Sequence, residues 1–193
     1  MSVNRQKGQK VELRKSNGGE LRKVMVGLGW DEVQKTGGFN TQDIDCDASA
    51  FLCVSGHLLT SDDVVYFGNL AHNSGCVRHM GDNLTGAGEG DDEQIFIDLA
   101  SLPAKYDKVV LVVNIYHANQ RGQHFGMIEN AFIRICDAET GQELCKYNLS
   151  ENYSGMTAMV FGEVYRRNGA WKFNAIGQPT RDNSVGDLAK RFV

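Results

Sequence analysis

The sequence has little of what would mark a membrane or secreted protein, and little that would interrupt a compact domain. Across its 193 residues, no apolar run approaches the roughly 20 residues that a transmembrane helix requires. The first sixteen residues carry basic side chains but lack the apolar stretch of a secretory signal. Only two prolines are present, and no low-complexity linker or internal repeat is visible. We therefore expect one domain over residues 1–193, located in the cytoplasm.

The cysteines lack the pattern of a disulfide-bonded or redox protein. Their number, five, is odd, and no CxxC pair occurs. Several of them, including Cys46, Cys53 and Cys136, lie inside apolar runs. Buried, reduced thiols in a reducing compartment explain this pattern best.

Positive charge is almost missing from the middle of the chain. Residues 36–104 contain eleven Asp or Glu and one basic residue, Arg78, whereas the remainder contains thirteen acidic and nineteen basic residues. The acidic middle would repel nucleic acid, and the flanks show no basic stripe with interleaved aromatic residues. Nucleic-acid binding is therefore not expected.

One stretch of this acidic segment carries the strongest functional signal. Residues 81–93 read GDNLTGAGEGDDE, in which four glycines are interleaved with seven oxygen-bearing side chains. These side chains belong to Asp82, Asn83, Thr85, Glu89, Asp91, Asp92 and Glu93. Ca²⁺ takes roughly 6–8 oxygen ligands from carboxylates, amides and carbonyls, and glycines let the backbone turn around it. The stretch therefore predicts a site for a hard divalent cation, because its carboxylates would otherwise repel one another at close range.

A second acidic group lies upstream, where the chain reads DIDCD. In a strand, Asp43, Asp45 and Asp47 project from one face at steps of about 6.6–6.8 Å, so one ion can bridge two neighbours but not the outer pair. We expect one or two ions, held between this strand and the loop. An EF-hand is excluded, because its sixth and twelfth positions would be Ala48 and Val54. A solvated acidic surface is the alternative interpretation.

The hydrophobic pattern predicts strands along most of the chain. Residues 44–54 alternate between two faces, and residues 108–117 form the nearly continuous apolar run of a central strand. Further short β-rich runs span residues 24–30, 64–67, 94–99, 131–136, 143–149, 156–166 and 170–176. Short strands at this spacing predict a mainly β fold, a two-sheet β-sandwich with a few short helices.

Local signals mark one hairpin and one helix. Asn168 and Gly169 stand between two β-rich runs, and a type I′ turn needs positive φ at both of its central residues. Near the C-terminus, Ser184 fits an N-cap with Asp187 at N3, ahead of apolar residues at helical spacing. Residues 119–130 fit either a loop or a short helix.

Other chemistries have weaker support. The GAGEG segment resembles a phosphate-binding loop, but acidic residues and a strand follow it instead of Lys-Ser/Thr and a helix. His72, Cys76 and His79 are zinc-ligand types, yet a fourth ligand is not evident in this stretch, although Cys46 or Cys53 could supply one in space. Surface turn residues are the simpler interpretation. No pattern for nucleophilic catalysis is present. The patch between His117 and His124 fits an ordinary surface loop, or a site for an anion or a protein.

Seven phrases occur in order along almost the whole chain. They are KGQ at 7–9, VGLGWD at 26–31, DCDASAF at 45–51, GDNLTG at 81–86, GDDE at 90–93, NAFIR at 130–134 and FGEVY at 161–165. Together they resemble the TerD family of tellurite-resistance and stress-response proteins. The resemblance implies a β-sandwich that binds Ca²⁺ through acidic residues and has no established enzymatic activity. It also implies resistance to tellurite and other toxic agents, together with companion tellurite-resistance proteins near the inner membrane.

The resemblance also implies a set of metal-site residues. Carried over residue by residue, they are Asp31, Asp45, Asp47, Asn69, Asp82, Asn83, Thr85, Glu89, Asp91, Asp92 and Glu93. Glu89 stands where the family often has Asp, which keeps an oxygen ligand. Gly68 precedes Asn69 where many members have two Asn, which weakens the case for a ligand from position 68. Cys46 occupies a position that is often Leu, which favours a structural thiol.

Two functions follow as expectations. The first is a non-enzymatic module in which one or two Ca²⁺ ions order the acidic loop and present a surface to partner proteins. The second is a metal-dependent enzyme, a hydrolase or a tellurite reductase, in which Mg²⁺ or Mn²⁺ in the same cluster activates a water. We favour the first, because no general base stands outside the ligand set and a thiol reductase would need paired cysteines. Neither a catalytic residue nor a cofactor other than Ca²⁺ is expected.

Overall fold

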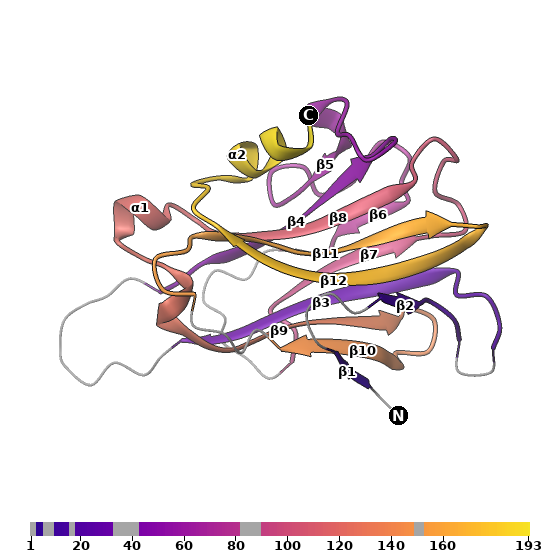
Figure 1. Ribbon diagram of the computed structural model, residues 1–193, viewed down its shortest axis with the longest axis horizontal. Coiled ribbons are helices and arrows are strands. Elements are labelled where there is room, and N and C mark those ends of the chain that lie inside the picture. The colour runs from indigo at the N-terminus through magenta and orange to yellow at the C-terminus, as the bar shows by residue number, and fades with distance from the viewer. Residues whose placement is uncertain (1–2, 6–9, 16–17, 33–42, 82–89, 149–152) are drawn as a thin grey trace.

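The protein folds into two sheets that pack face to face, as the computed structural model shows (Figure 1). The structure describes residues 3–5, 10–15, 18–32, 43–81, 90–148 and 153–193. Six strands form each sheet within these residues. The prediction of a mainly β, two-sheet sandwich is confirmed.

The strands are not in sequence order within either sheet. In spatial order, the first sheet contains β1 (Val3–Arg5), β10 (Glu143–Asn148), β9 (Ile128–Asp137), β3 (Lys23–Glu32), β7 (Glu93–Asp98) and β6 (Val77–His79). The second contains β2 (Lys10–Glu12), β12 (Ala170–Thr180), β11 (Ala158–Arg167), β8 (Lys108–Ile115), β4 (Cys46–Cys53) and β5 (Val64–Val65). Only β1 and β10 pair in parallel among the described strands.

All nine segments predicted as strands contain a strand, with ends shifted by a few residues. The structure adds β1, β2 and β6, which the sequence did not reveal. Each of these three has only three residues, which is too short for an alternating pattern to stand out. Of the three, β6 matters most for function, because it pairs with β7 beside the acidic residues.

The two faces of β4 enter two different cores. Ala48 and Ala50 point toward the other sheet and belong to the large core that fills the sandwich. Phe51 and Cys53 point the opposite way, into a smaller apolar cluster that also contains Leu188. This arrangement matches the alternation expected from the sequence. It also defines the outer face of the second sheet, on which Asp45 and Asp47 lie.

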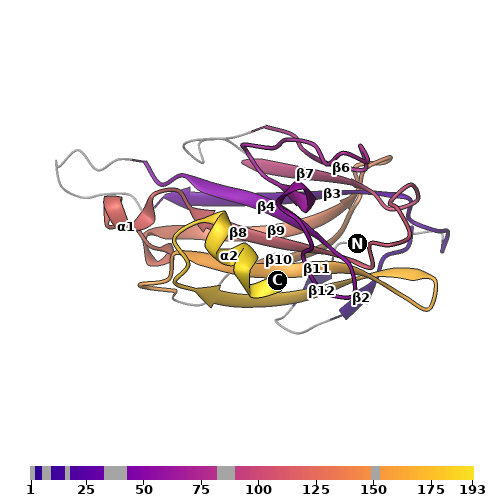
Figure 2. The same ribbon diagram turned by 90° about the horizontal axis from the view of Figure 1, so that it is seen from above.

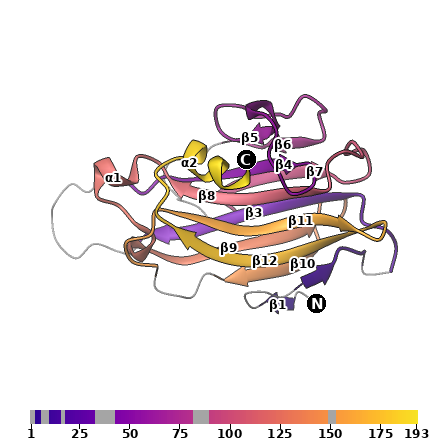
Figure 3. The ribbon, with the colours of Figure 1, turned by 45° about the horizontal axis from the view of Figure 1, so that its top comes forward.

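Short helices cover part of this outer face. Helix α1 (Ala118–Arg121) follows β8, and α2 (Val185–Ala189) packs against β8 (Figures 2 and 3). Ser184 caps α2 as predicted, because its hydroxyl accepts a hydrogen bond of 3.1 Å from the backbone N–H of Asp187. The 3₁₀ turns are η1 (Ser61–Asp63), η2 (Phe125–Met127) and η3 (Lys190–Phe192). None of the helices in these residue ranges has the length and apolar character needed to span a bilayer.

The turn between β11 and β12 is also the one predicted. Asn168 and Gly169 have φ angles of 54° and 76°, so both central residues are left-handed, as a type I′ hairpin requires. The 119–130 segment, for which the sequence left two alternatives, contains most of α1, all of η2 and the start of β9.

Candidate metal centre

The first acidic group lies at the beginning of β4, on the outer face of the second sheet. The Asp45 and Asp47 residues are only 6% and 2% exposed. Asp47 stands opposite Asn114 of β8, whose side-chain nitrogen donates to the Asp47 carboxylate at 3.4 Å. The carbonyl of Asp45 accepts a hydrogen bond of 2.8 Å from the backbone N–H of Tyr116. Pairing with β8 therefore fixes the backbone of this group, while Asp43 before it is exposed.

The second acidic group lies where the chain enters β7 from the first sheet. The backbone N–H of Asp92 donates to the carbonyl of Leu28 in β3 at 2.8 Å. In the other direction, the Asp92 carboxylate accepts from the backbone N–H of Trp30 at 2.9 Å. These two contacts tie Asp92 to β3 by both its backbone and its side chain.

Glu93 connects the two sheets. It is 2% exposed, and its carboxylate accepts a hydrogen bond from the backbone N–H of Ala48 in β4. The same carboxylate oxygen lies 3.5 Å from Nε2 of His79 in β6. Strand β5 pairs with β4 only at Ala50 and Phe51, so the Ala48 N–H lies on a part of the β4 edge that β5 does not cover. Glu93 supplies its partner there and holds the start of β7 against β4.

The buried thiol of Cys46 lies close enough to carboxylates of both acidic groups for their charges to act on it. Burial raises the pKa of Cys46 well above its usual value, and the negative charges of nearby carboxylates raise it further. In order of effect, these carboxylates belong to Glu93, Asp47, Asp45 and Asp92. The pKa of this one thiol is therefore raised both by carboxylates of the strand and by carboxylates at the end of the loop. All five cysteines are buried and none forms a disulfide, as expected for reduced structural thiols.

Asp91 already has a positive partner. Arg134 of β9 donates to both of its carboxylate oxygens, from Nε at 2.6 Å and from NH2 at 3.1 Å. Gln94 donates a third hydrogen bond at 3.0 Å. The carboxylate lies directly over Gly27 of β3, where a Cβ would come within 2.2 Å of the Asp91 Cγ atom. Only glycine at position 27 leaves room for Asp91 in this position.

Two further residues of the expected metal site lie in other surroundings. Asp31 is exposed, and its carboxylate accepts from the side-chain nitrogen of Asn130 at 2.8 Å. The side-chain nitrogen of Asn69 donates to the carbonyl of Val64 at 2.7 Å and so holds the turn after β5. Among the described residues, no hydrogen bond links Asn69 to the acidic groups.

The remaining expected ligands lie in residues 82–89, outside the described part of the chain. They are Asp82, Asn83, Thr85 and Glu89. Within the described ranges, no three His, Cys, Asp or Glu side chains are arranged so that they could hold a metal ion by themselves. The expected ligand set therefore stays a prediction.

A buried polar network near η1 was not found from the sequence. Tyr106 donates to the Asp63 carboxylate at 2.5 Å, and Nε2 of His72 lies 3.3 Å from the same oxygen. His72 and Cys76 are each 6% exposed, so their interpretation as surface turn residues was wrong. The one feature of the sequence that could have indicated this network is the position of Asp63, immediately before the apolar pair of β5.

This network predicts acid sensitivity. Burial alone would raise the pKa of Asp63, but hydrogen bonds from Tyr106, His72 and Thr60 hold it below its usual value. A carboxyl with a lowered folded pKa stabilises the fold above its unfolded pKa of about 3.9, and this contribution is lost as the pH falls through the folded pKa. We expect Tyr106→Phe to lose about 1–3 kcal/mol of unfolding free energy at pH 7 and less near pH 3.

Urea denaturation at the two pH values measures the difference. Tyr165→Phe is the control, because Tyr165 is partly exposed on β11, and it is expected to change stability by no more than about 0.5 kcal/mol. An equal loss for Tyr106→Phe at both pH values would contradict the assignment to Asp63.

Comparison with known proteins identifies the family. The family model described as the TerD domain matches residues 1–192. The chain belongs to the TerD domain family. Stress response protein SCP2 of Bacillus subtilis (strain 168) is 47% identical to it over 200 residues, which cover 100% of both chains. Tellurium resistance protein TerD of Serratia marcescens is 46% identical over 179 residues, 92% of this chain and 91% of that protein.

Solved structures share the TerD-domain fold. A crystal structure of a protein of unknown function superposes with a TM-score of 0.68 at 26% identity, covering 88% of this chain and 95% of that one. A homologue of a telluride resistance protein from Streptomyces coelicolor A3(2) gives a TM-score of 0.68 at 21% identity, covering 90% and 98%. The family resemblance inferred from the seven phrases is therefore confirmed.

Proposed function

We propose that this TerD-domain protein is a calcium-binding, non-enzymatic stress-response protein of the tellurite-resistance type. Carboxylates of the 45–47 strand and the 82–93 loop bind one or two Ca²⁺ ions, and the ion-loaded loop presents a surface to partner proteins. The observation that supports this most is the hydrogen bond from the Ala48 N–H to the Glu93 carboxylate, which brings the end of the loop against the strand that carries Asp45 and Asp47. The names of the relatives, which are stress-response and tellurium-resistance proteins, support the biological context.

The chemistry of the donor set fits a hard cation. Carboxylate oxygens are ligands that Ca²⁺ prefers, and the carboxylates of Asp45 and Asp47 are held in a buried position. Burial raises the pKa of Asp92, and the charges of Asp31 and Asp91 raise it further, despite the hydrogen bond from Trp30 that lowers it. A nearby divalent cation would favour the ionised form of such a carboxyl. When bound, the ion would supply charge neutralisation and would tie the strand to the loop.

Partner proteins are proposed from the same relatives. Three proteins of one organism, Serratia marcescens, match this chain and are named tellurium resistance proteins TerD, TerX and TerZ. Their coexistence supports a set of tellurite-resistance proteins that act together. We place this action in the cytoplasm, at the surface of the inner membrane.

The enzyme alternative receives no support from the side chains beside the acidic groups. A general base must reach the proton that it abstracts. His79, which lies against Glu93, has no exposed side-chain surface. Metal preference separates the two functions, because Ca²⁺ favoured over Mg²⁺ supports the binding module, whereas Mg²⁺-dependent turnover supports the enzyme.

Thermal melting with Ca²⁺ against EGTA tests the calcium proposal. An ion that binds only the folded state stabilises it by about 2.7 kcal/mol when free Ca²⁺ exceeds the Kd a hundredfold. Asp82→Ala combined with Asp91→Ala is expected to abolish the shift. Asp62→Asn is the matched control, because this exposed residue belongs to the same acidic segment and its variant should keep the full shift. No shift at millimolar Ca²⁺ would overturn the proposal.

Asp92→Asn provides a test in which two effects have opposite signs. The amide keeps an acceptor oxygen for the Trp30 N–H. It removes the Asp92 carboxyl, whose pKa is raised in the folded state, so that its ionised form disfavours folding. We therefore expect a higher melting temperature than the parent in EGTA and a smaller gain on adding Ca²⁺. Differential scanning calorimetry in both buffers measures the two effects. A variant that melts lower in EGTA would show that the Asp92 charge stabilises the ion-free protein.

A further inference from the structure

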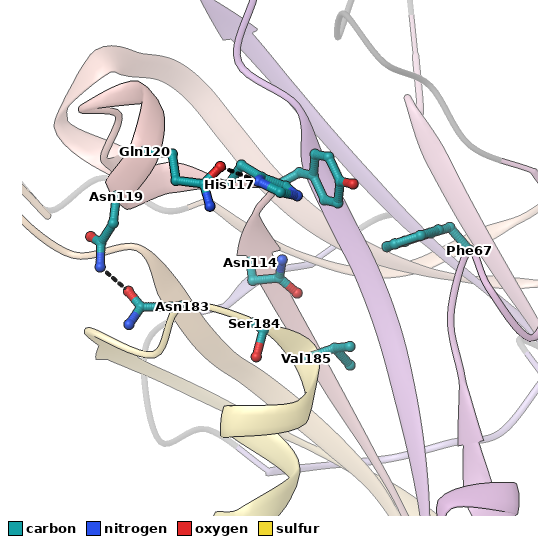
Figure 4. Close-up of a pocket in the computed structure, with 9 residues that line it drawn as sticks. Phe67, Asn114, His117, Asn119, Gln120, Asn183, Ser184 and Val185 are labelled. Atoms are coloured by element: carbon teal, nitrogen blue, oxygen red, sulfur yellow. Dashed lines mark hydrogen bonds between the residues drawn. The ribbon is translucent and has the colours of Figure 1, made fainter.

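A cavity of about 410 Å³ lies on the outer face of the second sheet. It is bounded by the end of β8, by α1 and by the segment that leads into α2 (Figure 4). Its volume falls within the range of about 300–1,000 Å³ that is usual for small-ligand sites. The expected calcium ligands do not line it, although its floor touches Asp47 through Asn114.

The floor of the cavity contains a buried hydrogen-bond acceptor. Asn114 is 4% exposed, and its side-chain nitrogen points to the Asp47 carboxylate. Because an ionised carboxylate only accepts hydrogen bonds, this contact fixes which end of the amide faces Asp47. The other end, Oδ1 of Asn114, accepts no hydrogen bond from the described residues. This oxygen is closed to solvent in the structure, so a ligand in the cavity reaches it only when the Asn114 amide turns toward the cavity. A buried acceptor without a partner gains free energy when a ligand then donates to it.

The rim adds further donors and acceptors. The side-chain nitrogen of Asn119 donates to Oδ1 of Asn183, which leaves the amide nitrogen of Asn183 and the oxygen of Asn119 for other partners (Figure 4). Gln120 Oε1 lies 2.6 Å from Nδ1 of His117, which leaves the Gln120 nitrogen as a donor. The backbone of His117 is left-handed, with φ of 54°. Such a conformation is uncommon for residues other than glycine, and it positions this rim.

One wall of the cavity is apolar. Phe67 and Tyr116 meet edge to face, with ring centroids 5.7 Å apart and planes at 90°. Val185 of α2 lies on the same wall (Figure 4). Phe67 is 38% exposed, so an apolar surface is available to a ligand. Among the described residues that line the cavity, none is Asp, Glu, Lys or Arg.

We propose that this cavity binds an uncharged sugar. Each hydroxyl of a sugar both donates and accepts, which matches the mixture of amide nitrogens and oxygens around the rim and at Asn114. The C–H face of a sugar ring can rest on Phe67 and Val185. A charged ligand would find no Asp, Glu, Lys or Arg as a counter-charge in the described part of the lining.

Nuclear magnetic resonance titration of the full-length, ¹⁵N-labelled protein tests the proposal. The probes are glucose, mannose, N-acetylglucosamine and maltotriose, with adenosine as the competing ligand class. We expect saturable shifts of the side-chain amides of Asn114, Asn183 and Gln120 at millimolar sugar. Maltotriose separates the sources of the sugar, because tighter binding of the trisaccharide indicates the end of a glycan and equal binding indicates a free monosaccharide.

Two variants and a control keep the test independent of folding. Asn183→Ala removes an exposed rim amide, and Asn114→Leu removes the buried acceptor at nearly constant volume. Each is expected to weaken sugar binding about fivefold, the effect of one lost hydrogen bond. Asn148→Ala changes an exposed amide of β10 in the other sheet and should leave the affinity unchanged.

The outcomes that overturn the proposal are distinct. One is the absence of saturable shifts with every sugar. A second is adenosine binding at these amides in preference to sugars. A third is a sugar affinity that Asn183→Ala and Asn114→Leu both leave unchanged, because binding would then occur elsewhere. None of these outcomes bears on the calcium proposal, which depends on the shift in melting temperature.

Discussion

Glu93→Ala is expected to destabilise the protein by about 3–5 kcal/mol, the range for removing one member of a buried, hydrogen-bonded pair. The carboxylate of Glu93 is the partner of the Ala48 N–H on the edge of β4, and it also lies against His79. Neither the Glu93 nor the His79 side chain has exposed surface. Without the Glu93 carboxylate, the Ala48 N–H would therefore lose its hydrogen-bond partner at a buried position. The loss would separate β7 from β4 and open the end of the sandwich where the acidic groups meet. Urea denaturation measures the change in unfolding free energy.

A matched glutamate provides the control. Glu139 has a close partner too, with its carboxylate 2.6 Å from the Lys15 amine, but both side chains are partly exposed. Glu139→Ala is expected to cost less than about 1 kcal/mol, as surface ion pairs do. Glu93→Gln keeps an acceptor for the Ala48 N–H, so its loss of unfolding free energy should lie between those of Glu93→Ala and Glu139→Ala. If Glu93→Ala and Glu139→Ala lower the unfolding free energy equally, the contact of Glu93 with β4 contributes no more to stability than a surface ion pair.

Gly27→Ala is expected to have the next largest effect, a loss of about 2–4 kcal/mol from overpacking and from a broken charge-assisted contact. The new Cβ would lie 2.2 Å from Cγ of Asp91. Asp91 would have to swing away, and both of its hydrogen bonds from Arg134 would be lost. We also expect weaker calcium binding, because the chain around Asp91 and Asp92 would move from β3. Denaturation and calcium titration of the same variant measure both effects.

A double-mutant cycle identifies the cause. In an Asp91→Ala background the clash is absent, so Gly27→Ala should cost less than about 1 kcal/mol there. Gly162 of β11 is the control, because a Cβ at this position would meet the backbone oxygen of Asn174 at 2.7 Å. Gly162→Ala should therefore cost the same in both backgrounds. Equal costs of Gly27→Ala in the two backgrounds would rule out the clash with Asp91.

The sequence predicted the sandwich because long strands carry their own signal. The alternation along β4 and the continuous apolar run of β8 correctly indicated one strand with two core faces and one central strand. The three-residue strands gave no such signal. The order of strands also could not be predicted, since β3 lies between β7 and β9, and nothing local in the sequence specifies neighbours so distant along the chain.

The candidate site was predictable only in part, for a similar reason. Spacing indicated that Asp45 and Asp47 share a face, and the structure places both on the outer face of β4. Spacing gave no information on the contacts of the neighbouring loop residues. Asp91 pairs with Arg134 across β3, while Glu93 points between the sheets. Such contacts depend on partners 43 and 45 residues away, and the strand order of both sheets determines them.

The side-chain amide of Asn114 lies between the proposed calcium site and the proposed sugar site. One end of its amide contacts the Asp47 carboxylate, and the other end accepts no hydrogen bond from the described residues, beneath the cavity beside α2. A cation that competes for the Asp47 oxygens and a sugar that donates to Asn114 would thus act on the same side-chain amide. Thermodynamic linkage makes such an effect reciprocal, so the factor by which Ca²⁺ changes sugar affinity equals the factor by which the sugar changes Ca²⁺ affinity. The outer face of the second sheet would then report metal occupancy as a change in ligand affinity, without any movement of the strands.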